Sequence, residues 1–225
     1  MAHPLDRPAW ASLRTRQRAL ARGEGAALRY DPEYAIFAAT ADDEPVSLTA
    51  LGALIAVTGP AIVLQKDVLP PVPGTYVEKH RMGVQMVAEE IAGTSEIDFL
   101  ELGNPDAAEM LALATLTEPG PFFARTHRLG SFIGIRHAGQ LVAMAGERMK
   151  PAGFTEVSGV CTHPDFRGRG HARALMAVVA ERILARGDTP FLHAYADNRG
   201  AIALYESLGF RVRCEMNVTV LTGGV

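Results

Sequence analysis

The sequence predicts an α/β fold with a smaller α/β lobe at its N-terminus. The first observation is residues 157–162, a short apolar and β-branched segment that is typical of a buried strand. The second is the segment after it, where apolar residues recur three and four positions apart and mark one face of a helix. These residues are Ala172, Leu175, Met176, Val179, Ile183 and Leu184. Strand-like and helix-like segments alternate along the rest of the chain, which is the order of the α/β class.

Length and composition describe a globular protein with a core of ordinary size. The 225 residues suffice for one large domain or two small ones, and 48% of them are hydrophobic. The net charge of −3 gives no support for a nucleic-acid partner, which usually requires a basic face. No apolar run reaches the ~18 residues of a membrane span, because Gly52, Gly59 and Pro60 interrupt the longest candidate. Two cysteines, Cys161 and Cys214, are too few for a disulfide framework or a metal site, so we expect a cytoplasmic protein without metal.

Residues 1–95 are predicted to form the small N-terminal α/β lobe. The arginine-rich start, 1–24, is compatible with organelle import, but a helix with Trp10, Leu13 and Leu20 on one face explains it more simply. Further on, the patterns indicate strands at 27–30, 34–39, 61–65 and 84–89, a helix at 47–57, and an irregular proline-rich crossing at 68–74. The lobe shows no phosphate loop and no catalytic set. It can be interpreted as a degenerate half-copy of the second domain, a substrate lid or an interface.

Residues 96–225 are predicted to form the larger domain. It begins with a strand at 97–102, and Asn104 is the expected N-cap of a helix that runs to about Thr117. A β-hairpin follows, with strands 131–136 and 140–148 around the turn 137–139. After the central strand and the long helix come a strand at 190–195, a helix at 198–208, and final strands at 210–214 and 216–221.

The junction between the central strand and the long helix has the properties of an anion-binding loop. It reads Arg167-Gly168-Arg169-Gly170-His171-Ala172. The first turn of a helix presents unpaired N–H groups and partial positive charge, and glycine allows a diphosphate to approach the backbone closely. Arg167, Arg169 and Arg173 would add charge around it. The simpler interpretation is a tight strand-to-helix turn with no ligand.

Two motifs in this domain resemble those of the GNAT superfamily of acyl-CoA-dependent N-acetyltransferases. Arg167, Gly170 and Ala172 fit the pattern Arg-x-x-Gly-x-Ala, which resembles the acetyl-CoA pyrophosphate motif. Residues 198–210 fit Asn-x-x-Ala-x-x-Leu-Tyr-x-x-x-Gly-Phe, which resembles the second hallmark of the superfamily. The resemblance covers about residues 96–220 and leaves the N-terminal lobe out. It implies a mixed, twisted sheet with helices on both faces, and acetyl-CoA as the cosubstrate.

The resemblance also implies a set of cofactor-binding residues. The edge of the central strand would pair with the pantetheine arm of the cofactor, as in strand addition, and a bulge at Gly159 is expected there. Asn198 would bind the same arm or cap its own helix. The implied residues are Val160, Cys161, Thr162, Arg167, Gly168, Arg169, Gly170, His171, Ala172, Arg173 and Asn198.

Three residues are candidates for the acid and the base. Tyr205 matches the superfamily's proton donor to the leaving thiolate. His193 and Glu156 are alternative bases: a glutamate at the position of Glu156 serves some protein-acetylating members, and histidine suits base work near neutrality. The position of His193 is a glutamate in the enzymes that acetylate ribosomal-protein N-termini, so their substrate is not implied. Cys161 could form an acyl-cysteine, but a small buried thiol is the favoured interpretation.

These features predict an N-acyltransferase that transfers acetyl from acetyl-CoA to an amine by direct attack in a ternary complex. The alternative is a non-catalytic acyl-CoA-binding or sensing module. Glu147 and Glu156 hint at a cationic amine, but a polyamine, an amino acid, an antibiotic and a protein N-terminus all remain open as acceptors. We expect neither a nucleic-acid nor a membrane partner, and a homodimer remains open.

Overall fold

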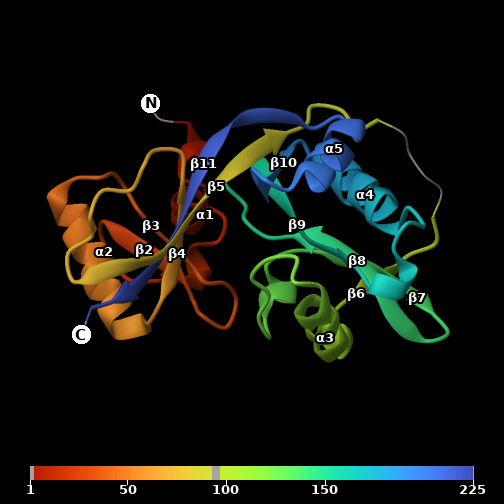
Figure 1. Ribbon diagram of the computed structural model, residues 1–225, viewed down its shortest axis with the longest axis horizontal. Helices are drawn as coiled ribbons and strands as arrows, with labels where there is room; N and C mark the ends of the chain where they lie inside the picture. Colours follow the sequence, from red (N-terminus) through yellow and green to blue (C-terminus); the bar gives the residue numbers. More distant parts are fainter. Residues whose placement is uncertain (1–2, 93–96, 225) are drawn as a thin grey trace.

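A computed structural model describes residues 3–92 and 97–224, whose strands join in one 11-stranded sheet (Figure 1). The order across the sheet is β1-β2-β3-β4-β11-β5-β10-β9-β8-β7-β6. The strands are β1 (Ala21–Arg22), β2 (Ala27–Tyr30), β3 (Phe37–Thr40), β4 (Ala61–Gln65), β5 (Thr75–Val87), β6 (Leu100–Leu102), β7 (Phe132–His137), β8 (Gln140–Glu147), β9 (Phe154–Thr162), β10 (Thr189–Tyr195) and β11 (Arg211–Gly223). Because β3–β4 and β9–β10 pair in parallel while the other neighbours are antiparallel, the predicted mixed sheet is confirmed.

Five α-helices in the described residues cover the two faces of this sheet (Figure 1). They are α1 (Pro8–Arg14), α2 (Pro45–Thr58), α3 (Ala107–Thr117), α4 (His171–Ala185) and α5 (Arg199–Ser207). Short 3₁₀ turns stand at Pro4–Asp6, Arg18–Leu20, Asn104–Asp106, Thr126–Arg128 and Pro164–Phe166. None of the helices in these ranges is long and apolar enough to cross a bilayer.

Alternation along β8 assigns one face of the sheet to α4 and the other to α3. Ala143 and Ala145 belong to the cluster built on α4, and Met144 between them belongs to the cluster built on α3. The N-terminal half is layered in the same way. Phe37 and Leu64 face the cluster that contains α1, while α2 packs on the opposite face.

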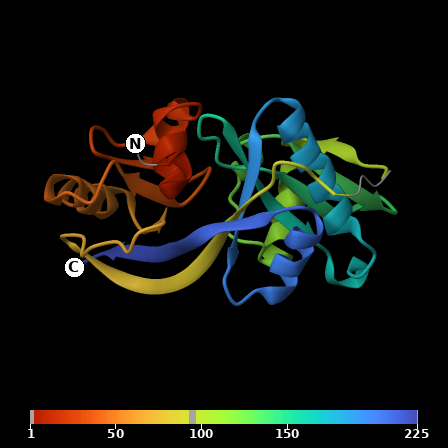
Figure 2. The same ribbon diagram turned by 90° about the horizontal axis from the view of Figure 1, so that it is seen from above.

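Two long antiparallel strands, β5 and β11, run through both halves of the molecule (Figure 2). β11 pairs on its other side with β4, where Asn217 lies opposite Gln65 and Leu221 opposite Ala61. The C-terminal strand therefore completes the sheet of the N-terminal half. The division into domains of residues 1–95 and 96–225 stays a prediction. β11 belongs to the second of these ranges but pairs with β4 and β5 of the first.

Most of the predicted elements stand where the patterns indicated, and three local predictions are wrong. The two final strands are one strand, β11, whose register shifts between Val212 and Cys214. β5 begins at Thr75, well before the predicted start at residue 84. Asn104 does not cap α3: it opens a 3₁₀ turn, and its Oδ1 accepts a hydrogen bond from Arg128 Nε at 3.0 Å.

Candidate active site

A cleft with a volume of about 960 Å³ lies between the central strand and its neighbour, and it brings the candidate residues together. It is lined by residues from β9, β10, α4, α5, the loop after α3 and the N-terminal half. The candidates that line it are Glu156, Val160, Cys161, Thr162, Arg167, Gly168, Arg169, Gly170, His171, Ala172, Arg173, His193, Asn198 and Tyr205.

The cleft exists because β9 and β10 part. They pair in parallel only where Phe154 to Glu156 of β9 lie opposite Thr189 to Phe191 of β10. Beyond that point β10 continues with β5, while β9 stays with β8. The widening gap leaves backbone and side chains of both strands facing a shared space.

A bulge in β9 confirms the expectation for Gly159. Three residue steps on β9, from Ser158 to Cys161, match two on β8, and Gly159 has a φ of 63°, which favours glycine. A Cβ at this position would also come within 2.8 Å of Phe132 Cε1. The extra residue reverses the alternation, so that Val157 faces α4 while Cys161 faces α3.

The loop before α4 has the geometry of an anion-binding turn. Gly168 and Gly170 have φ values of 75° and 80°, and a Cβ at either would meet no atom within 4 Å. Gly170 is the N-cap of α4, which presents its first N–H groups and the positive end of its dipole to the cleft. The backbone conformation of the loop therefore favours glycine at both positions, and the space next to them is open.

The basic side chains around this loop carry no compensating acid. Arg167, Arg169 and Arg173 form no ion pair with a residue that the structure describes, and their hydrogen bonds go to backbone carbonyls at 3.3–3.5 Å. His171 Nδ1 is buried and has no hydrogen-bond partner among the described residues. This end of the cleft thus combines positive charge with unused donor capacity.

At the other end of the cleft, Glu156 is fully buried on β9 and forms a bidentate ion pair with Arg148. Its oxygens accept from Arg148 Nε and Nη2, both at 2.8 Å, and from the Met149 N–H at 3.2 Å. Burial alone would raise the pKa of the carboxyl, but the charge and hydrogen bonds of Arg148, helped by His193, hold it well below its usual range. Glu156 is therefore a carboxylate at neutral pH and is poorly suited to accept a proton.

His193 has a hydrogen-bond partner at each ring nitrogen. Nδ1 lies 2.7 Å from Glu156 Oε1, and Nε2 lies 3.0 Å from Gln85 Nε2. The Gln85 amide is oriented by Arg213, which donates to Oε1 at 2.8 Å, and by the carbonyl of Leu5, which accepts from Nε2 at 2.9 Å. These partners place the proton of the neutral ring on Nδ1 and leave the lone pair on Nε2.

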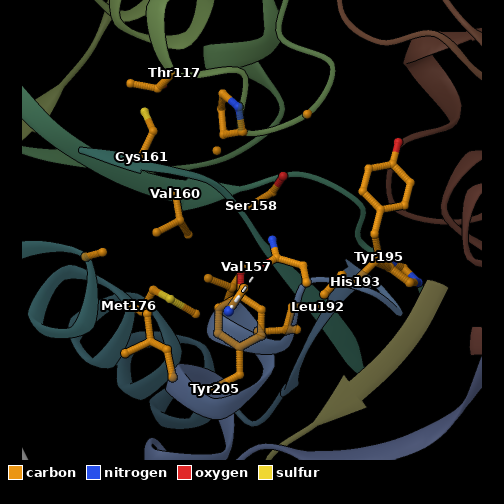
Figure 3. A pocket seen from close by; sticks show the side chains of 18 of the residues that line it. Thr117, Val157, Ser158, Val160, Cys161, Met176, Leu192, His193, Tyr195 and Tyr205 are labelled. Atoms are coloured by element: carbon orange, nitrogen blue, oxygen red, sulfur yellow. Dashed lines mark hydrogen bonds between the residues drawn. The ribbon is translucent and has the colours of Figure 1, made fainter. Parts of the chain in front are cut away.

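Tyr205 and Asn198 come from α5. Asn198 is the N-cap of this helix, as expected, and its side chain accepts from the Ala201 N–H at 3.2 Å. Tyr205 is half-buried, and burial raises the pKa of its hydroxyl. In the view of Figure 3 its ring lies between Met176 and Leu192, beneath Val157, while His193 and Tyr195 stand further along β10 toward the N-terminal half.

Comparisons with known proteins show the family of this chain. The family model described as FR47-like protein matches residues 132–219. A solved structure described as an acetyltransferase from the GNAT family, from Novosphingobium aromaticivorans, is 43% identical, covers 100% of both chains and has a TM-score of 0.93. This chain belongs to the GNAT family.

Two further proteins to which this GNAT chain is similar are named as acetyltransferases. A GCN5-related N-acetyltransferase from Kribbella flavida, 18% identical, shares the fold over 99% of this chain and 96% of its own, with a TM-score of 0.69. The N-alpha-acetyltransferase RimI of Mycobacterium tuberculosis is 34% identical over 102 residues, which are 42% of this chain and 63% of that protein. The match thus spans less than two-thirds of this curated relative.

The expected placement of Glu147 near the acceptor is wrong in this GNAT protein. Glu147 and Glu156 were expected near the acceptor as attractors of a cationic amine. Glu147 is 2% exposed and does not line the cleft, and it pairs with Arg186 and, at 2.7 Å, with Lys150. Both carboxylates are already neutralised by the protein's own cations.

Cys161 has the character of a buried thiol in this GNAT chain. It is 6% exposed, and burial raises its pKa to about 11. A thiol with that pKa holds almost no thiolate at neutral pH, so the acyl-cysteine route has no activated nucleophile.

Sequence reasoning missed a whole wall of the GNAT cleft. Residues of β3, β4, β5 and β11 line it, together with the loop after α3. They are Phe37, Ile62, Leu64, Arg81, Gly83, Met216 and Val218, then Thr117 at the end of α3, and in the loop Glu118, Pro119, Gly120 and Pro121. None belongs to a motif. The only signal was apolar alternation in the strands, which does not tell a cleft from a core.

Proposed function

We propose that this protein transfers an acetyl group from acetyl-CoA to an amine by direct attack in a ternary complex. The observation that carries the proposal is the single cleft, formed where β9 and β10 part, which joins the α4 anion loop to Tyr205 and to the Glu156–His193 pair. One end suits a diphosphate and the other holds groups that can move protons.

The residues of the anion loop and of the β9 edge would hold the cofactor. Its diphosphate would accept hydrogen bonds from the first N–H groups of α4, with charge from Arg167, Arg169 and Arg173. The open space above Gly168 and Gly170 leaves room for this approach. Val160, Cys161 and Thr162 would offer backbone groups to the pantetheine arm, which Asn198 borders at the start of α5.

Tyr205 would act as the general acid. As the amine nitrogen forms its bond to the acetyl carbon, the carbon–sulfur bond breaks and the thiolate takes the Tyr205 proton. Since burial raises the pKa of this phenol, it stays protonated at neutral pH, which is the state that an acid requires.

His193 would accept the proton that the amine loses. Its lone pair lies on Nε2, and Glu156 holds the Nδ1–H, an arrangement in which a carboxylate orients an imidazole for base work. The Gln85 amide donates to Nε2 in this structure, so the amine would have to replace it. Glu156 is then a positioning residue.

A thiol-release assay with acetyl-CoA and a panel of amines tests the proposal. We expect release of CoA that depends on the amine, with acetyl-amine as the second product by mass spectrometry. Tight binding of acetyl-CoA without turnover on any amine would favour the alternative, a non-catalytic acyl-CoA-binding module.

We propose a reducing, cytoplasmic setting for the reaction. Cys161 and Cys214 are both free thiols, as is usual for proteins of that compartment. Burial raises the pKa of both, which protects them from oxidation.

A further inference from the structure

The N-terminal half presents an apolar wall to the cleft. Five of the lining side chains, from three neighbouring strands, make it, and we call them the N-terminal wall: Phe37, Ile62, Leu64, Met216 and Val218. The register explains their grouping, because Phe37 lies opposite Ile62 and Leu64 opposite Val218. Ile62 and Val218 are half-buried, whereas Phe37, Leu64 and Met216 are almost fully buried around them. The methyl groups available to a ligand are therefore those of Ile62 and Val218.

The N-terminal wall continues without a break to the catalytic groups. On β5, Gly83 lies opposite Met216 on one side and opposite Tyr195 on the other. A Cβ at Gly83 would come within 3.0 Å of the Ala194 carbonyl oxygen and 3.5 Å of Val218 Cγ2. Because Gly83 has no side chain, the surface stays flat between Val218 and Tyr195. Tyr195 is two residues from His193 on β10. A ligand on the wall would thus reach the proposed base.

The charges beside the N-terminal wall are paired among themselves. Arg148, stacked 4.6 Å over the Phe37 ring, is neutralised by Glu156. Arg81, 3.6 Å over the Tyr195 ring, is paired with Asp197 at 2.8 Å. The other lining carboxylate, Glu118, belongs to the loop after α3 and not to the wall. A polyamine would find no unpaired anion on the wall, and its own charges would lose hydration there.

We infer that the acceptor is an amine whose non-reacting body is an apolar group, aryl or branched aliphatic, which binds against Ile62 and Val218. The inference rests on the proposed acetyl transfer and specifies its substrate class. The N-terminal half then selects the acceptor, while the motifs of the C-terminal half bind the cofactor. A difference of one methylene group in an apolar pocket changes kcat/KM between two substrates by about 10- to 200-fold.

The test compares phenethylamine and isoamylamine with putrescine and spermidine as acceptors of the 225-residue chain. We expect kcat/KM for the apolar amines to exceed that for the polyamines by at least about tenfold. Val218→Thr, which keeps the shape but adds a hydroxyl, should raise KM for phenethylamine about tenfold with kcat unchanged. Val220→Thr is the matched control, because Val220 shares the strand, the face and the partial burial but does not line the cleft. We expect it to change KM less than twofold.

Preference for the polyamines, or equal effects of Val218→Thr and Val220→Thr, would overturn the inference and leave acetyl transfer standing. Absence of turnover on every amine would instead refute the proposed function. Calorimetric titration of the CoA-loaded protein with phenethylamine and spermidine then decides the inference separately. Phenethylamine binding that is no tighter than spermidine binding would overturn it.

Discussion

Nδ1 of His193 lies 2.7 Å from Oε1 of Glu156, and this contact bridges two strands at the point where they part. Glu156 is the last residue of β9 in register with β10, opposite Phe191, and His193 stands two residues beyond that pair. A side-chain hydrogen bond thus replaces the backbone ladder at the closed end of the cleft. The imidazole is held in one orientation by a carboxylate that is itself fixed by Arg148.

Glu156→Gln should strongly destabilise the fold. The change leaves the buried Arg148 guanidinium without its counter-ion, which typically costs about 3–5 kcal/mol. Urea denaturation measures the loss. Glu101→Gln is the control, because Glu101 pairs with Arg182 at the exposed surface, where such pairs contribute ~0–1 kcal/mol. Equal losses of unfolding free energy in the two variants would show that the buried Arg148–Glu156 pair stabilises the fold no more than an exposed pair does.

The same pair predicts how stability depends on pH. The pKa of Glu156 is lowered in the folded state, so its contribution is present above the unfolded value of ~4.3 and is lost as pH falls below it. The difference in stability between the wild type and Glu156→Gln should therefore be largest near neutrality and shrink in acid. A difference that stays constant from pH 7 down to acid unfolding would contradict this assignment.

His193→Gln should lower kcat without weakening acetyl-CoA binding. Glutamine can still hydrogen-bond to Glu156 but accepts no proton, so the loss should lie in the range of ~10²–10⁴-fold that general base catalysis provides. His163→Gln is the control, since His163 lies in the loop after β9 and outside the cleft lining. If a folded Glu156→Gln protein loses turnover while His193→Gln keeps the wild-type kcat, the two roles are reversed.

Gly170→Ala should weaken acetyl-CoA binding beyond its effect on stability. At a φ of 80° any residue other than glycine is strained, so the reference must be a variant with the same backbone strain away from the loop. Gly187, just past the other end of α4, also has φ 80° and open space around its Cβ position. Gly187→Ala should lower Tm about as much and leave the calorimetric Kd unchanged. Equal Kd values for the two variants would contradict the proposal that the diphosphate of acetyl-CoA binds at this loop.

Cys161 should never carry the acetyl group. With its pKa raised to about 11, the thiol should react with iodoacetamide far more slowly than a free cysteine at pH 8. Mass spectrometry of the protein quenched during turnover should show no added acetyl group on the peptide that contains Cys161. An acetylated Cys161 that forms and decays at the rate of turnover would restore the acyl-cysteine route.

The fold of the C-terminal half could be predicted because its local patterns agree with its tertiary structure. Periodicity located α4 and β9, and the motif residues Gly170 and Tyr205 line one cleft. Asn104 shows the limit of local reasoning, because its amide is used by Arg128 and the chain turns as a 3₁₀ helix before α3. Nothing local to the sequence around Asn104 reports that long-range contact.

The N-terminal contribution to the cleft could not be predicted, for two physical reasons. The first half of β5 is polar and mostly exposed, so the hydrophobic pattern of the sequence does not indicate a strand before Gly83. Pairing of β11 with both β4 and β5 then depends on residues more than a hundred positions apart, such as Val218 and Leu64. The polarity of Glu156 was visible in the sequence, but its burial against Arg148 was not, and that burial is why we propose it as a positioning residue.

Turnover of Tyr205→Phe, with acetyl-CoA affinity measured on the same protein, tests the central claim most directly. The change removes only the phenolic hydroxyl from a half-buried ring that packs against Phe210, so folding and cofactor binding should persist. We predict wild-type Kd for acetyl-CoA and a fall in kcat of ~10²–10⁴-fold, because the leaving thiolate loses its proton donor. A fall of less than about threefold, with acetyl transfer shown to be rate-limiting, would contradict the assignment of Tyr205 as the acid.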